Sequence, residues 1–296
     1  MEIESKIDGF LSGMLIGNAI GIHRTSKLGP LPSSDVLLSL SMIDSISKST
    51  TDEMQKQAMI ASLAKYGATT GRGFCDEITE IVAAKLAKGE VREGAIGVDS
   101  YGPLVRAITI GALFSNFKQD QVMVSRLIDT VKMNCQLTHE DARPQCTSIS
   151  VALMVYYSMK GIPVGTWLNE LSYPLAGVDN QLLRILDLVL MAYSTGGAVP
   201  ICTGSAGVLA NAFYCILCAR NDYWKGIGMV YGDFGEGTAS ALGSIVGACL
   251  GSSTGMDQLS KIEVPEKLKA AGITIDKFKE EEYYKTAKKS MMEFMI

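Results

Sequence analysis

Two short acidic segments, each at the start of an expected helix, are the residues best suited to do chemistry. Thr51-Asp52-Glu53 opens a helix expected over 53–66, and Asp233 and Glu236 precede one expected over 237–250. Each segment also fits simple helix capping, because Thr50 with Glu53 three positions later is a capping box and Asp233 with Glu236 could make a similar cap. If both helix starts converge, the carboxylates would repel unless a cation lay between them. Oxygen ligands of this kind suit Mg²⁺, Mn²⁺ or Ca²⁺ rather than zinc.

The composition excludes several other kinds of site. The two histidines, His23 and His139, are too few for a histidine-rich zinc site, and any scheme with a nucleophile and a histidine would have to use one of them. The seven cysteines are odd in number and lie in apolar stretches, which favours a reduced cytoplasmic compartment. Cys215 and Cys218 form a CxxC inside an apolar run, so core packing is the expected role.

The overall charge argues against a polyanionic partner. The chain has 27 Lys and Arg against 31 Asp and Glu, a net charge of −4, and it has no block rich in lysine and arginine. Nucleic-acid binding depends on such cations. We therefore expect no nucleic acid among the partners.

The mean hydropathy of +0.20 raises the question of a membrane protein. Residues 188–219 carry no charged side chain, and roughly 20 apolar residues suffice to span a bilayer. Gly196, Gly197 and Pro200 interrupt the run, however, which favours a loop between two buried helices. An acidic segment precedes the apolar stretch 9–22, which is wrong for a secretory signal. We expect a soluble, unprocessed cytoplasmic protein without a membrane span.

The segments that must position the acidic residues show mostly helical periodicity, so the predicted fold class is all-α. Helices are expected over 6–21, 53–66, 76–88, 104–116, 119–131, 139–159, 181–193, 207–219 and 237–250. No repeat or low-complexity linker is present, which predicts one domain over residues 1–296. The amphipathic tail, residues 261–296, is expected to form peripheral, solvated helices.

Glycine recurs every four residues along two of these helices, at positions 9, 13, 17 and 21 and again at 243, 247 and 251. A glycine inside a helix costs about 1 kcal/mol relative to alanine, so such rows imply a very close neighbour. That neighbour is either another helix at a tight crossing or a ligand beside these helices.

The order of motifs resembles the ADP-ribosylglycohydrolase family, of the type that activates dinitrogenase reductase. Residues 13–21 resemble its opening GxxxGDAxG helix, Thr51–Met54 its TDDT, Ser100-Tyr101-Gly102 with Arg106 its SYGN or GNGxxMR stretch, and Thr138–Asp141 its THxD. Residues 235–248 align without gaps on its GGDTDTxAxxxGxxxGA. These matches cover most of residues 9–255.

The resemblance implies a compact orthogonal bundle of helices and a hydrolase that cleaves the glycosidic bond of ADP-ribosylated protein or small-molecule substrates. It implies one or two Mg²⁺ or Mn²⁺ ions, with metal ligands carried over as Thr51, Asp52, Glu53, Asp233 and Glu236. Asp52 and Glu53 would also be catalytic, with a carboxylate as base or proton carrier. Ser100, Tyr101, Gly102 and His139 would lie along the ADP-ribose.

The sequence departs from the family pattern at several positions that would bear on catalysis. Asn18 stands in place of an aspartate in the opening helix, and Thr25 stands where a catalytic glutamate is expected. Phe234 and Gly237 replace an aspartate and a threonine of the second motif. An alternative function follows: a weak or inactive member that binds ADP-ribose or a nucleotide, or has a structural role. His139 has its own alternative, as the first residue of a helix capped by Thr138.

Overall fold

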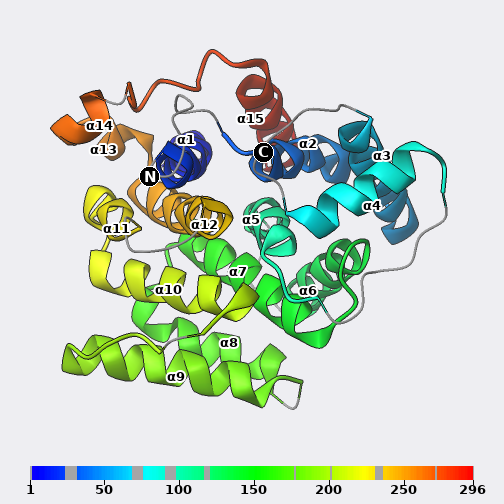
Figure 1. Cartoon of the computed structure of the whole chain (residues 1–296). Helices are drawn as coiled ribbons and strands as arrows, with labels where there is room; N and C mark the ends of the chain where they lie inside the picture. The colour runs from blue at the N-terminus through cyan, green and yellow to red at the C-terminus, as the bar shows by residue number, and fades with distance from the viewer. Residues whose placement is uncertain are drawn as a thin grey trace.

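The computed structural model describes residues 2–23, 32–68, 76–90, 98–116, 121–176, 178–200, 202–230, 236–270 and 272–295. Every regular element in these ranges is a helix, which confirms the all-α prediction (Figure 1). The helices are α1 Ile3–His23, α2 Ser34–Ser47, α3 Asp52–Gly67, α4 Glu77–Ala87, α5 Gly102–Phe114, α6 Gln121–Gln136, α7 Ala142–Lys160, η1 Val164–Thr166, α8 Trp167–Leu175, α9 Asn180–Thr195, α10 Gly204–Ala219, α11 Tyr223–Met229, α12 Glu236–Thr254, α13 Met256–Leu259, α14 Glu266–Ala270 and α15 Glu282–Met295.

The helices stack in layers around α12. α1 packs along α12, which in turn rests on α7 and α10, and α9 covers α10 at the lower edge of the molecule (Figure 1). Helices α2 to α6 form the other side, joined to the centre by the packing of α5 on α7. Buried apolar side chains from Ile7 to Met295 form one continuous cluster. That continuity supports the proposal that the chain forms a single domain.

The two glycine rows face each other across an antiparallel contact between α1 and α12. A Cβ at Gly13 would lie 2.2 Å from the carbonyl oxygen of Gly247, and one at Gly17 would lie 2.0 Å from that of Gly243. Gly9 meets Gly251 in the same way, at 2.3 Å. Backbone therefore packs directly on backbone, which confirms the tight crossing and leaves no room for a ligand between these rows.

Helix α2 was missing from the sequence prediction. Ser33 is its N-cap and accepts a hydrogen bond from the backbone N–H of Val36 at 3.4 Å, and Asp35 lies in its first turn. Its apolar face is buried through Val36, Met42 and Ile43. The frequent serines weaken the helical signal, because serine competes with the backbone for hydrogen bonds.

The last helix of the C-terminal tail, α15, buries one face against the bundle. Tyr284 and Met291 of α15 are buried in the core cluster, and α15 packs on α2, α1 and α5. Lys288 forms ion pairs with Glu4 and Asp8 of α1, each at 2.8 Å. Helix α15 is thus an integral part of the bundle. In the part of the chain that the structure describes, no helix is long and apolar enough to cross a membrane.

Buried thiols make stability fall at alkaline pH. Burial raises the pKa of Cys135 and of Cys215 to about 12, whereas an unfolded thiol has a pKa of about 8.5. Above that value the unfolded chain loses thiol protons that the folded chain keeps, so the free energy of unfolding decreases as pH rises. At pH ~9.5 the loss is about 1.4 kcal/mol per thiol.

Urea unfolding at a series of pH values between neutral and mildly alkaline measures this loss. A variant with Cys135→Val and Cys215→Ala is expected to start from a lower stability but to show a shallower decline with pH. An equal decline in the variant and the parent would contradict the assignment to these thiols.

Candidate functional site

The starts of four helices meet on one side of α12. Asp35, in the first turn of α2, accepts a hydrogen bond from the backbone N–H of Asp76, the N-cap of α4, at 3.1 Å. A Cβ at Gly102, which opens α5, would lie 2.8 Å from Oδ2 of Asp76. A Cβ at Gly237, in the first turn of α12, would lie 1.8 Å from the hydroxyl of Tyr101. We call this region, the starts of α2, α4, α5 and α12, the helix-start junction.

Asn18 of α1 forms hydrogen bonds with residues at the starts of α2 and α12. Its amide nitrogen donates to Oγ of Ser33 at 3.0 Å, to the carbonyl of Ser240 at 3.2 Å and to Oγ of Ser244 at 2.9 Å. Its oxygen accepts from the backbone N–H of Ser33 at 2.6 Å. The side chain is fully buried. The residue that departs from the family's aspartate therefore connects α1, α2 and α12 with neutral hydrogen bonds.

Ser100 and His139, both predicted to contact ligand, are brought together. Oγ of Ser100 lies 2.6 Å from Nε2 of His139, and Nδ1 of the imidazole lies 2.8 Å from Oγ1 of Thr138. The neighbouring Asp99 accepts from the backbone N–H of Ser205, which fixes the segment to the start of α10. Ser100 and Tyr101 are partly exposed, whereas His139 is fully buried behind them. The imidazole is therefore shielded from a ligand at the surface of the junction, whereas Ser100 and Tyr101 are partly accessible.

The three residues Ser100, His139 and Asp76 do not form a nucleophilic triad. Oδ2 of Asp76 lies 3.8 Å from Nε2 of His139, the same nitrogen that meets Ser100. In a triad the carboxylate holds the other ring nitrogen, so that the first can take the serine proton. The arrangement therefore lacks the carboxylate on Nδ1 that a nucleophilic triad requires.

Arg106 is the buried cation behind the junction. Its guanidinium donates to Oδ1 of Asn134 at 3.0 Å, to Oγ1 of Thr79 at 3.0 Å and to Oγ1 of Thr138 at 2.5 Å. Thr79 in turn donates to Oδ2 of Asp76 at 2.8 Å. Arg106 is completely buried, so it holds α4, α5 and α6 in register rather than contacting a ligand.

The first acidic motif, Thr51-Asp52-Glu53, lies at the start of α3 and not at the helix-start junction. Thr51 caps α3 by accepting from the backbone N–H of Met54 at 3.2 Å, and Glu53 accepts from Gln57 at 2.8 Å. Thr51, Asp52 and Glu53 are exposed. The chain reaches them only after running the length of α2, 14 residues or about 20 Å, away from Ser33. The structure therefore does not bring this motif to the buried junction, and the capping alternative describes what it does.

The second acidic motif is only partly visible. Asp233, and likewise Thr25 and Phe234, lie outside the described residues, and Glu236 is described only as the first residue of α12. Among the side chains that the structure describes, no group of three or more His, Cys, Asp or Glu is arranged to hold a metal ion. The described residues alone do not make the Mg²⁺ or Mn²⁺ site that the resemblance implies.

Two acidic residues at the junction escaped the sequence analysis. Asp35 and Asp76 are both buried, at 1% and 3% exposure. The signal for Asp35 was present, since Ser33-Ser34-Asp35 followed by an apolar run is a helix start. Asp76 was read only as the first residue of a helix. Neither could be placed beside α12 without the packing of the helices.

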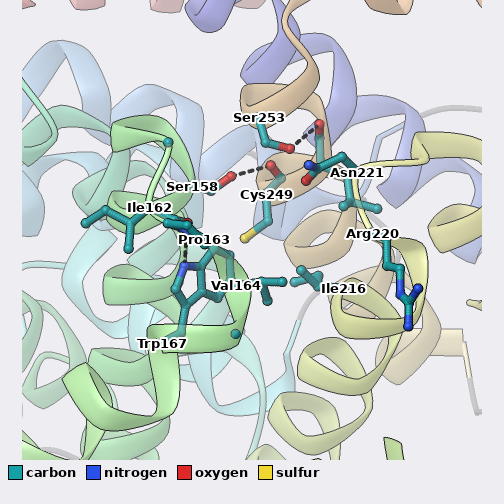
Figure 2. Close-up of a pocket in the computed structure, with 13 residues that line it drawn as sticks. Ser158, Ile162, Pro163, Val164, Trp167, Ile216, Arg220, Asn221, Cys249 and Ser253 are labelled. Atoms are coloured by element: carbon teal, nitrogen blue, oxygen red, sulfur yellow. Dashed lines mark hydrogen bonds between the residues drawn. The ribbon is translucent and has the colours of Figure 1, made fainter.

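A separate cavity lies near the other end of α12. It has a volume of about 390 Å³ and lies where α7, α10 and α12 end (Figure 2). Apolar side chains, among them Pro163, Trp167 and Ile216, form much of its wall. From Gly237 to Cys249 of this cavity, α12 rises about 18 Å. None of the described residues that line the cavity is a histidine or a carboxylate, so it offers no acid or base for hydrolysis.

Comparisons with known proteins agree with the fold. Residues 1–284 match the sequence model of a family described as ADP-ribosylglycohydrolase. A solved structure described as an "ADP-ribosylglycohydrolase-related protein complex" is similar to the chain with a TM-score of 0.68 and 16% sequence identity, covering 100% of this chain and 99% of the other. At that identity the likeness concerns the fold. No curated protein matches the chain significantly.

Proposed function

Because the chain belongs to the ADP-ribosylglycohydrolase family, we propose that it acts on ADP-ribosylated substrates and holds their ADP-ribose at the helix-start junction. The observation that carries this proposal is the meeting of four helix starts beside the partly exposed residues Ser100 and Tyr101. Helix starts carry partial positive charge and backbone N–H donors, which suit a pyrophosphate. The two hydroxyls suit its oxygens or those of a ribose.

Hydrolysis of the glycosidic bond would need a carboxylate beside the ribose to move a proton. In this proposal Asp233 and Glu236 remain the acidic candidates at the start of α12. Asp52 and Glu53, the predicted catalytic pair, would have to act from the exposed start of α3. The nature of the acceptor, protein or small molecule, is open within the proposal.

A second candidate function is binding of an ADP-ribose-containing molecule without turnover. The neutral side chain of Asn18 favours this second function. Its buried amide hydrogen-bonds to Ser33, Ser240 and Ser244 at the position where the family pattern has an acid in the opening helix. A member of this kind would recognise an ADP-ribosylated protein and leave the modification in place.

Calorimetric titration of ADP-ribose tests the binding part of both candidates. Ser100→Ala is expected to weaken the affinity about fivefold to tenfold, since one hydrogen bond is worth about 1–1.5 kcal/mol. Ser253→Ala, in the separate cavity, is the matched control and should leave the affinity unchanged. No saturation with ADP-ribose, or a larger effect at Ser253, would contradict the junction as the site.

A turnover assay with arginine-linked and serine-linked ADP-ribosyl peptides then separates the two candidates. Release of ADP-ribose supports the hydrolase, and binding without release supports the second candidate. Replacing Asp52 and Glu53 with alanine tests the prediction from sequence: lost release assigns the chemistry to the start of α3, and retained release assigns it to the junction.

A further inference from the structure

The cavity near the C-terminal end of α12 has the size and the lining of a small-molecule site. Its volume of about 390 Å³ lies within the roughly 300–1,000 Å³ of known ligand pockets, and all of its lining residues belong to the described ranges. We propose that this cavity binds a small, uncharged molecule made of an apolar ring and a primary amide, and that Asn221 recognises the amide. The inference does not depend on the proposed function.

The walls of the cavity suit an apolar ring. Pro163 and Trp167 lie on one side of it and Ile216 on the other, and Leu250 of α12 adds a further apolar side chain (Figure 2). A flat ring between these two sides would present one apolar face to each. Burying apolar surface in this way removes it from water, which favours binding.

Asn221 supplies the hydrogen-bonding group that such a ligand would meet. Ser158, Ser253 and Trp167 also line the cavity, but each donates to a backbone carbonyl, at 2.5, 3.0 and 2.9 Å. In the part of the chain that the structure describes, no hydrogen bond engages the carboxamide of Asn221, which points toward Cys249 and Ser253 (Figure 2). A carboxamide offers a donor and an acceptor side by side, so it pairs with a ligand that offers the same two groups.

The backbone holds Asn221 in place at the cavity wall. Arg220 and Asn221 follow α10 in the left-handed region, with φ of 50° and 71°. Asparagine tolerates this region better than most residues that carry a side chain. The carbonyl of Asn221 accepts from Oγ1 of Thr254 at 3.4 Å, which ties the turn to the end of α12. Binding therefore has to order only the side chain of Asn221, which keeps the entropic cost small.

The charges around the cavity favour an uncharged ligand. Helices α7, α10 and α12 all end here, and the partial negative charge of helix C-termini disfavours a carboxylate or a phosphate. Arg220 is the one charged side chain among the described residues of the wall, and it disfavours a cation. Its Nε donates to the hydroxyl of Tyr193 at 3.0 Å, and its guanidinium lies 5.8 Å from the centre of that ring. Burial raises the pKa of Cys249, so this thiol adds no charge.

Three ring compounds of nearly the same shape test the inference on the full-length protein: benzamide is neutral, benzoate is an anion and benzamidine is a cation. Each is titrated and its binding followed by ligand-observed nuclear magnetic resonance. Benzamide is expected to bind with a Kd of about 0.1–1 mM, as suits a ligand of nine heavy atoms. Benzoate and benzamidine are each expected to bind at least about fivefold more weakly, because each lacks half of the donor–acceptor pair.

Variants at position 221 assign the binding to this cavity. Asn221→Gly removes the carboxamide and suits the left-handed backbone, so it should fold as well as the parent and weaken benzamide binding at least about fivefold. Asn221→Asp keeps the shape and replaces the donor with a negative charge, so this variant should bind benzamidine more tightly than benzamide. Asn169→Ala, on the exposed face of α8, is the control and should leave benzamide binding unchanged.

Three results would overturn the inference: no saturable binding of benzamide below about 10 mM, an affinity for benzoate equal to or above that for benzamide, or unchanged benzamide binding in Asn221→Gly. The second of these would assign the cavity to an anion held by Arg220. Failure of ADP-ribose to bind would leave all three measurements standing, because none of them uses the helix-start junction.

Discussion

Gly17→Ala is expected to destabilise the protein by several kcal/mol, enough to lower its melting temperature by ten degrees or more or to prevent folding. The added Cβ would lie 2.0 Å from the carbonyl oxygen and 2.7 Å from the carbonyl carbon of Gly243. Both atoms are backbone, so relief requires α1 and α12 to move apart. That movement would open contacts along the whole seam, including those of Gly13 and Gly9. The gain in helix propensity, about 1 kcal/mol, is too small to compensate.

The matched control is Gly228→Ala, also inside a helix. Position 228 lies in α11, and a Cβ there would meet no atom within 4 Å. Differential scanning calorimetry should show an unchanged or slightly raised melting temperature for this variant, because only the helix propensity changes. Equal melting temperatures for Gly17→Ala and Gly228→Ala would refute the backbone contact between α1 and α12.

Arg106→Met is the second large effect. Methionine keeps much of the volume and removes the guanidinium, which leaves Asn134, Thr79 and Thr138 each without a donor in a buried place. Removing one member of a buried charged network costs about 3–5 kcal/mol, because the remaining polar groups lose their partners. Since Thr138 also holds Nδ1 of His139, the orientation of Ser100 should loosen as well.

Urea unfolding followed by circular dichroism measures the cost. Arg106→Lys is expected to rescue little, because an ammonium group cannot reach three oxygens on three separate segments in the fixed planar arrangement of a guanidinium. Arg184→Met, on the exposed face of α9, is the control and should change the free energy of unfolding by less than about 0.5 kcal/mol. Full rescue by lysine would show that charge alone matters at position 106.

Much of the fold could be predicted because its signals are local. Periodicity placed α1, α7, α10 and α12 within a few residues of their observed bounds, and the glycine spacing predicted a tight crossing. The amphipathic pattern of the tail did not show how deeply one face of α15 is buried. Helix α2 was missed because its many serines conceal an apolar face that becomes clear only when α5 and α15 pack on it.

The site was harder to predict because it depends on which helix starts meet. The structure brings Ser100 within 2.6 Å of His139, two residues that the resemblance assigns to one site. The acidic motif at Thr51 has the sequence expected of the first half of the site, yet it opens a helix that packs on α2, α4 and α6. Asp35, with a less distinctive sequence, is the acid that the packing buries at the junction. The sequence motifs alone therefore could not show which acidic residue the packing of the helices places at the junction.

The pairing of α1 with α12 also determines when the protein can fold. Asn18 and its partner Ser244 are 226 residues apart in the chain. At ribosomal speeds of about 5–20 residues per second, the first helix waits on the order of ten to fifty seconds for its counterpart to be synthesised. Until then its glycine-lined face has nothing to pack against, and a chain that stops before residue 236 never acquires the centre of its core. The core of this protein can therefore form only after α12 has been synthesised. Until then, other molecules must shield the unpacked face of α1 in the nascent chain.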